Sequence, residues 1–220
     1  MGDVTALLAG WLAVCGLKRE AAIWGDRAVV GGGRADRLAE RLRAMIQDSR
    51  PQGLVSFGLA GALSPALAVG EVVIGETVMF GAQSWACDAE AAQALSLRLA
   101  TAPLRVLGVD HVVADTAEKA VLAARADIID MESQVAAEVA EREGLPLAVL
   151  RVVSDGAGHV LPPAAIAGFR EDGEIDVSAV VAALARDPRQ LPALIEMGRN
   201  SGLAFRRLKA VRGGLFSSLA

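Results

Sequence analysis

The fold is decided by the stretch Asp130-Met-Glu-Ser-Gln-Val-Ala-Ala-Glu-Val-Ala-Glu-Arg-Glu-Gly-Leu-Pro-Leu-Ala-Val-Leu-Arg-Val-Val-Ser-Asp155, which predicts a helix leading into a buried strand. Met131, Val135 and Val139 recur every four residues, while charged side chains gather on the opposite side. This spacing predicts an amphipathic helix over residues 131–143.

The second half of the stretch has the composition of a strand that is covered on both faces. Gly144 is suited to end the helix, and Pro146 cannot continue it. Residues 147–153 are almost purely apolar and rich in valine and leucine, as in the strands of parallel sheets. We expect the strand to stop at Ser154-Asp155.

This helix and strand bring the chain back to the edge of the sheet where the helix starts. Both elements are about 20 Å long and run in opposite directions, so Glu132 and Asp155 should lie at the same edge. In open α/β sheets, ligands bind beyond the carboxyl ends of the strands. Arg151, four residues before Asp155, points to the same side and is expected to brace a carboxylate.

Composition predicts one cytoplasmic domain over residues 1–220. The chain is 53% hydrophobic, has a net charge of −4 and lacks a linker-like segment, so it can bury a large core and has no basic footprint for nucleic acid. Cys15 and Cys87 make no metal spacing and are expected to be reduced. The apolar run 4–17 lacks the basic start of a signal peptide, and we expect a first buried strand with a short extension there.

The remaining pattern predicts a single three-layer αβα domain with a twisted mixed sheet, because short apolar runs alternate with helical segments. The expected strands cover residues 11–15, 28–30, 53–58, 72–74 and 104–109. The expected helices start near residue 19 and cover residues 34–47, 89–99, 118–126 and 177–198, the last interrupted at Pro188 and Pro192, while 156–163 is a loop long enough to wall a pocket.

Two glycine-rich turns are candidates for ligand contact. The turn Gly31-Gly32-Gly33 precedes a helix, so it is either an anion cradle assisted by Arg34 or a plain tight turn. Gly58, Ala60 and Gly61 follow a buried strand, where small residues allow a ligand to approach the backbone. The second turn could equally be a loop that only reverses the chain.

The last segment, 200–220, has four basic residues and no acidic one. It predicts a basic amphipathic helix, which either contacts an anionic bilayer surface, for instance the inner membrane, or packs on the domain.

With these motifs in view, the sequence resembles the family of purine nucleoside phosphorylases and methylthioadenosine/S-adenosylhomocysteine nucleosidases over residues 12–158. The resemblance rests on Gly58-Leu-Ala-Gly61 through Val69-Gly-Glu71 and on Asp130-Met-Glu132 through Ser154-Asp155. Within the family, the chain is most similar to the hopanoid-associated phosphorylases. The motifs behind that closer likeness are Gly-Leu-Lys-x-Glu at 16–20, Val-Asp-His-Val-Val at 109–113, Leu-Pro-Pro at 161–163 and Gln-Leu-Pro-Ala-Leu at 190–194.

The resemblance implies cleavage of the N-glycosidic bond of a purine nucleoside. By position, Met131 would pack beneath the ribose, Glu132 would accept hydrogen bonds from its hydroxyls, and Asp155, oriented by Ser154, would protonate the purine. Val113 falls where the family holds the base. The aromatic residue usual nearby is Val112 in this chain, so the wall against which the base stacks stays open.

The chemistry requires the two carboxyl groups to differ in charge. Protonating adenine as its bond stretches is worth about 10² to 10⁴ in rate, so Asp155 should hold a proton in apolar surroundings. An ionised Glu132 would favour the positive charge that develops on the ribose.

The nucleophile is either water or phosphate. Glu20 falls near the acid that activates water in the nucleosidases, one residue off their spacing, while Gly32, Gly33 and Arg34 are candidates to bind phosphate. The subgroup resemblance implies phosphorolysis of adenosylhopane in hopanoid biosynthesis, with release of adenine. We also expect no cofactor or metal, and peripheral membrane contact through 200–220 if the substrate is a lipid. The family is usually dimeric, trimeric or hexameric, and we expect a homodimer.

Two other functions stay open. One is a soluble hydrolase of methylthioadenosine or S-adenosylhomocysteine, and the other is a non-catalytic scaffold that binds nucleotide or a lipid surface. A dinucleotide-binding dehydrogenase is disfavoured, because no Gly-x-Gly-x-x-Gly follows the first strand.

Overall fold

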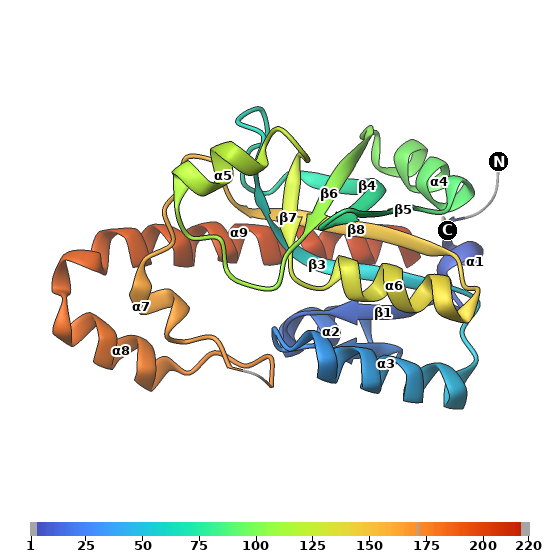
Figure 1. Cartoon of the computed structure of the whole chain (residues 1–220), viewed down its shortest axis with the longest axis horizontal. Helices are drawn as coiled ribbons and strands as arrows, with labels where there is room; N and C mark the ends of the chain where they lie inside the picture. Colours follow the sequence, from blue (N-terminus) through green and yellow to red (C-terminus); the bar gives the residue numbers. More distant parts are fainter. Residues whose placement is uncertain (1–3, 171, 217–220) are drawn as a thin grey trace.

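The structure is a computed structural model that describes residues 4–170 and 172–216. Eight strands form a mixed sheet between helical layers, which confirms the predicted αβα domain (Figure 1). The strands are β1 (Leu12–Cys15), β2 (Ala28–Val30), β3 (Leu54–Ala62), β4 (Val72–Phe80), β5 (Gln83–Ala86), β6 (Pro103–Gly108), β7 (Ile128–Asp130) and β8 (Leu147–Asp155).

The helices cover both faces of the sheet. One face packs against α3 and α6, and the other against α1, α2, α4 and α9, as Figure 1 shows for α3 and α6 on one side of the strands and α9 on the other. The helices are α1 (Val4–Leu8), α2 (Lys18–Trp24), α3 (Ala35–Ser49), α4 (Ala89–Leu99), α5 (Thr116–Leu122), α6 (Ser133–Glu143), α7 (Pro163–Ile166), α8 (Val177–Arg186) and α9 (Leu191–Phe216), with a 3₁₀ turn at Pro188–Gln190.

Strand β8 shows why the central strands have continuous apolar sequences. Leu147, Val149 and Val153 belong to the core under α3 and α6, while the alternate residues belong to the core under α9. Successive side chains of a strand point to opposite faces, so both faces of β8 are buried. Arg151 takes a position in the row that faces α6, in the middle of an otherwise apolar core.

Part of the sheet closes on itself. Strand β3 pairs with both β8 and β7, and β4 and β6 link β8 back to β7, so five strands form a closed ring. At the end of β3, Gly61 has Ile129 of β7 as its partner on one side and Asp155 of β8 on the other. The ring thus places the end of β8 and the strand β7, which precedes α6, on two sides of the same glycine.

Three local expectations were wrong. The N-terminal segment forms the helix α1 rather than an extension of the first strand. Strand β7 lies directly before the opening stretch, and α6 starts at Ser133 instead of residue 131. The predicted break at Pro188 is present, but Pro192 lies in the first turn of the long helix α9, where a missing N–H costs no helical hydrogen bond.

The last helices divide into a buried and an exposed part. In the second half of α9, Phe205, Leu208 and Val211 are buried against the domain. By contrast, α8 has no buried residue, and together with α7 and the start of α9 it forms an arm beside the sheet (Figure 1). No helix within the described part of the chain is long and apolar enough to cross a membrane.

Candidate active site

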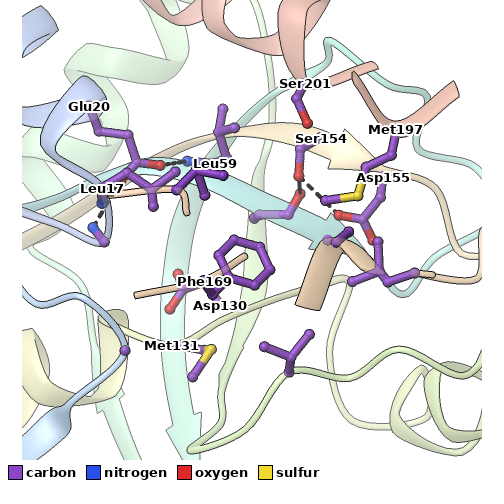
Figure 2. A pocket seen from close by; sticks show the side chains of 18 of the residues that line it. Leu17, Glu20, Leu59, Asp130, Met131, Ser154, Asp155, Phe169, Met197 and Ser201 are labelled. Atoms are coloured by element: carbon purple, nitrogen blue, oxygen red, sulfur yellow. Dashed lines mark hydrogen bonds between the residues drawn. The ribbon is translucent and has the colours of Figure 1, made fainter. Parts of the chain in front are cut away.

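A cavity of about 600 Å³ lies at the edge of the sheet where β1, β3 and β8 end, and the arm of α7, α8 and α9 forms its outer wall. Its size is typical of small-molecule sites. Figure 2 shows Glu20 on one side of the view and the Ser154–Asp155 pair on the other, with Met131 and Phe169 between them. Four carboxyl groups line it, those of Glu20, Asp130, Glu132 and Asp155.

Glu20 is held by the backbone at the turn between β1 and α2. Its Oε2 accepts the N–H groups of Gly16 and Leu17, both at 2.9 Å, and its Oε1 accepts the N–H of Leu59 at 2.8 Å. The first two bonds have the capping-box form, in which a glutamate in the first helical turn reaches back to the preceding N–H groups. Burial raises the pKa of Glu20, while Arg151 and the three N–H groups oppose that shift.

Glu132 and Asp130 share one buried arginine. The Nε of Arg151 lies 2.9 Å from Asp130 Oδ2, and its Nη2 lies 3.4 Å from Glu132 Oε2. Arg151 Nη2 also donates to the hydroxyl of Ser56 at 2.6 Å, and Asp130 accepts the N–H and hydroxyl of Ser133. The expectation that Arg151 braces a carboxylate is therefore confirmed, with two carboxylates instead of one.

The charge expected on Glu132 differs from what the structure gives. Burial, the largest cause, together with the nearby carboxylates of Asp130 and Glu20, raises the pKa of Glu132 to about 8, although Arg151 counteracts it. At pH 7 the protonated carboxyl is therefore favoured. Ionisation of Glu132 has to come from a ligand or from a higher pH.

Asp155 faces a cation instead of the apolar surroundings that the sequence predicts. Its Oδ2 lies 2.5 Å from the ammonium nitrogen of Lys119, and its Oδ1 accepts the hydroxyl of Ser154 at 2.9 Å. Ser154 also approaches the carbonyl oxygen of Ala60 at 3.2 Å. The apolar strand before Asp155 packs into the core and does not surround the carboxyl group.

Three glycines make room for three of these carboxyl groups. A Cβ atom at Gly16 would lie 2.7 Å from Glu132 Oε1, and one at Gly58 would lie 2.5 Å from the carboxyl carbon of Glu20. At Gly61 it would lie 3.0 Å from Asp155 Oδ2. The small residues after β1 and in β3 therefore admit the carboxyl side chains of the protein itself.

Most residues singled out from the sequence line this one cavity, and two do not. Gly58 is behind Glu20, and Arg34 forms a two-point ion pair with Asp36, Nη2 to Oδ2 at 2.8 Å, outside the lining. Those that line it are Glu20, Gly32, Gly33, Ala60, Gly61, Val113, Met131, Glu132, Ser154 and Asp155.

The sequence reasoning missed Lys119 and the aromatic side chains of the cavity. Lys119 shares a helical face with Leu122, Ala123 and Ala126, so a lysine on an apolar stripe was the available signal. Phe169 and Phe205 line the cavity from the arm and from α9. No local pattern identifies them, because the arm meets the sheet only through the tertiary fold. Within residues 4–216 apart from 171, no cluster of three or more histidine, cysteine, aspartate or glutamate side chains is arranged to hold a metal ion.

Comparison with known proteins identifies a family. The model of the phosphorylase superfamily matches residues 11–186, which include every residue of the cavity named above except Phe205. A search of curated proteins found no match.

Several solved structures have a similar fold. The S-adenosylhomocysteine nucleosidase of Streptococcus pyogenes, in complex with 5-methylthiotubericidin, has a TM-score of 0.66 at 14% identity and covers 96% of this chain and 97% of its own. The Helicobacter pylori nucleosidase variant with 5′-methylthioadenosine in its active site has 0.64 at 13%, covering 96% and 98%. The futalosine hydrolase of the same species has 0.59 at 14%, covering 93% and 98%.

Proposed function

The chain belongs to the phosphorylase superfamily, and we propose that it cleaves the N-glycosidic bond of an adenine nucleoside. The observation that carries the proposal is the pair of carboxyl groups, Asp155 and Glu132, that the ends of β8 and β7 bring into one cavity. Asp155 with Ser154 lies at the end of β8, and Glu132 with Met131 lies between β7 and α6. One group can serve the base while the other serves the ribose.

On the base side, Asp155 delivers a proton to the purine as its bond to the sugar breaks. The hydroxyl of Ser154 fixes Oδ1, so the carboxyl group has one orientation. Val113 and the neighbouring loop after β6 form the wall of the cavity at this side. Phe169, which lies inside the cavity in Figure 2, offers the aromatic face that Val112 lacks.

On the sugar side, Glu132 accepts the ribose hydroxyls above Met131. A positive charge developing at the anomeric carbon favours the ionised carboxylate, and Arg151 behind it disperses the negative charge. Because the pKa of Glu132 is about 8, substrate binding and reaction both draw the proton away from this group. Glu132 therefore contributes more to the transition state than to the ground state, which is the requirement for catalysis.

Water is the nucleophile that the charges of the site favour. Two basic side chains near the mouth are already paired, Arg34 with Asp36, and Lys18 with Glu174 at 2.8 Å, while Arg19, which lines the cavity, packs over the ring of Phe205. Glu20 accepts three N–H groups and so retains one of the roughly four acceptor positions of a carboxylate for a water molecule. Burial raises the pKa of Glu20, which makes its carboxylate a stronger base toward that water molecule.

Phosphorolysis is the second candidate, and the glycine turn after β2 favours it. Gly32 and Gly33 have φ values of 62° and 75° and line the cavity just before α3. The N–H of Gly32 donates to the carbonyl oxygen of Gly16 at 3.1 Å, so the N–H of Gly33 and the start of α3 are what this turn offers an anion. The two reactions differ in their products. We expect release of adenine at the same rate with and without phosphate, together with a free sugar. A sugar 1-phosphate and a rate proportional to phosphate would support phosphorolysis instead.

The cavity continues into an apolar cleft between α8 and α9, which fits a hydrophobic group on the 5′ carbon of the ribose. Its walls carry Val180 on α8 and Leu194 and Met197 on α9. A long hydrocarbon such as that of adenosylhopane could lie there, and a methylthio group would fill only its start. The charged end of S-adenosylhomocysteine would lose water against these apolar side chains.

A substrate panel separates these classes. We expect kcat/KM to rise from S-adenosylhomocysteine to methylthioadenosine, and again to adenosine derivatives with long 5′ hydrocarbon groups. A preference for S-adenosylhomocysteine would refute the proposal that the substrate carries an apolar 5′ group. It would leave the proposed cleavage of the N-glycosidic bond unaffected.

The basic residues of the last helix are the remaining candidates for contact with a bilayer. Deleting residues 200–220 would remove the buried Phe205 and Leu208, so charge reversal of Arg206, Arg207 and Lys209 is the cleaner change. We expect it to weaken binding to anionic vesicles while the turnover of a water-soluble nucleoside is kept. Unchanged vesicle binding would exclude this contact. The dimer stays a prediction, which sedimentation can test.

A further inference from the structure

Lys119 is a buried cation directly behind the group that serves the base. Its side chain is 1% exposed, although lysine is among the residues least often found buried. Its ammonium lies 2.5 Å from Asp155 Oδ2 and also donates to the carbonyl oxygens of Gly156 at 3.1 Å and His159 at 3.2 Å. The three N–H groups of the ammonium are thus all used at the end of β8 and in the loop that follows.

Lys119 acts through Asp155 and not on the ligand itself. Asp155 lines the cavity, whereas Lys119 does not. Stability alone is a poor explanation for such a pair, because a buried ion pair is often no more stabilising than apolar side chains of similar volume. The pair joins α5, which is otherwise a short surface helix, to the one carboxyl group that must deliver a proton.

We propose that Lys119 is a positioning residue that supplies the proton which Asp155 passes to the leaving base. The inference rests on the proposed cleavage of an adenine nucleoside. It explains how a carboxyl group that faces a cation can still act as an acid.

The steps balance in protons and electrons. The bond between the anomeric carbon and the purine nitrogen breaks, and its electron pair goes to the purine. Starting from the ion pair, the ammonium of Lys119 gives a proton to Asp155 Oδ2, and Asp155 passes one proton to the purine. The pair is left as a neutral amine beside a carboxylate. Water adds its oxygen to the sugar and gives a proton to Glu20. After the products leave, Glu20 releases this proton to solvent and the pair takes one proton back from solvent.

Other titratable groups surround this pair and must be separated from it. The loop carries His159, whose Nδ1 accepts the N–H of Gly156 at 3.1 Å and whose Nε2 lies 3.6 Å from Glu196 of α9. A second histidine, His111, lies between the carboxyl groups of Asp110 and Glu118, of which Glu118 is on α5. These groups are retained when Lys119 is replaced, so a difference between two pH profiles reports on Lys119.

The test compares two substrates in Lys119→Met and Lys119→Arg. An adenine nucleoside needs protonation of its leaving group, and 4-nitrophenyl β-riboside does not. We expect Lys119→Met to lower kcat on the adenine nucleoside by about 10²-fold, the usual share of a general acid, with KM kept. Turnover of the nitrophenyl riboside should stay within about threefold of the unmodified protein, because no proton is required there.

Three further readouts distinguish proton supply from packing. The pH profile of kcat should differ between the unmodified protein and Lys119→Met, because only the unmodified protein has an ammonium group that supplies the proton. Lys119→Arg keeps the charge but cannot give up a proton in this range, so it should not recover the rate. Asp155→Asn combined with Lys119→Met should lose little beyond Asp155→Asn alone, since the two groups act as a unit.

Each contrary result has a distinct meaning. Equal losses on both substrates, or full recovery by Lys119→Arg, would overturn proton supply and leave Lys119 with a structural role. If the unmodified protein releases adenine and Lys119→Met does so equally fast, the inference about Lys119 fails alone. If the unmodified protein releases no adenine from any nucleoside of the panel, the proposed function fails and the inference fails with it.

Discussion

Replacing Arg151 with methionine should destabilise the protein strongly, because this side chain is the counter-charge of two buried carboxyl groups. Arg151 is fully buried, and so is the side chain of Asp130, while that of Glu132 is 10% exposed. Removing one partner of a buried ion pair costs about 3–5 kcal/mol. For a chain of this size each kcal/mol lowers the melting temperature by about 2–4 °C, so a fall of roughly 6–20 °C is expected.

The loss should depend on pH in a definite direction. The pKa of Glu132 is about 8 with Arg151 present, and the arginine lowers it, so the variant should hold the Glu132 proton to a still higher pH. A carboxyl group whose pKa is raised in the folded state contributes stability at low pH and loses it as pH rises through that pKa. The cost of Arg151→Met should therefore be smaller at pH 6 than at pH 9.

Urea unfolding followed by tryptophan fluorescence at both pH values measures this effect. The matched control is Arg142→Met, which removes an exposed ion pair with Glu138 on α6 and should cost about 0–1 kcal/mol. A cost of Arg151→Met below about 1 kcal/mol at pH 9, close to that of the control, would refute the account of this buried cluster. An equal cost at both pH values would refute the proposed role of Glu132 ionisation.

Three further predictions concern activity. Gly58→Ala places a Cβ 2.5 Å from the Glu20 carboxyl carbon, so kcat/KM should fall by about 10². The control is Gly213→Ala, whose Cβ meets nothing within 4 Å, and equal activities of the two variants would contradict the assigned contact. In a pH series, kcat/KM should rise through about pH 8 as Glu132 loses its proton, and Glu132→Gln should abolish this rise. A rise that persists in Glu132→Gln would belong to another group. Val180→Asp should raise KM for long 5′ hydrocarbon groups by roughly 10-fold or more but leave it unchanged for 5′-methylthioadenosine; equal changes would exclude the cleft as their site.

The sequence predicted those helices and strands that a short window of residues specifies. The period of Val135 and Val139 and the apolar run of β8 are properties of short windows, and both elements are present within two residues of their expected ends. The return of Glu132 and Asp155 to one cavity followed from the lengths of these elements. The three-residue strand β7 is too short to show a period, so it was missed.

The charges of the site could not be predicted in the same way, because they depend on contacts between distant segments. Lys119 reaches Asp155 across 36 positions of sequence, and Arg151 reaches Ser56 across 95. The closed ring of strands sets both approaches, and no local pattern specifies that closure. The sequence therefore indicated which carboxyl groups meet, while their protonation required the fold.

The most direct test of the central claim is adenine release from a 5′-substituted adenosine, followed by mass spectrometry for the unmodified protein and for Asp155→Asn, with nucleoside binding measured in parallel. The account predicts adenine release by the unmodified protein, a loss of about 10²-fold or more in Asp155→Asn, and similar binding by both. Absence of release by the unmodified protein, or equal release by the two, would contradict it.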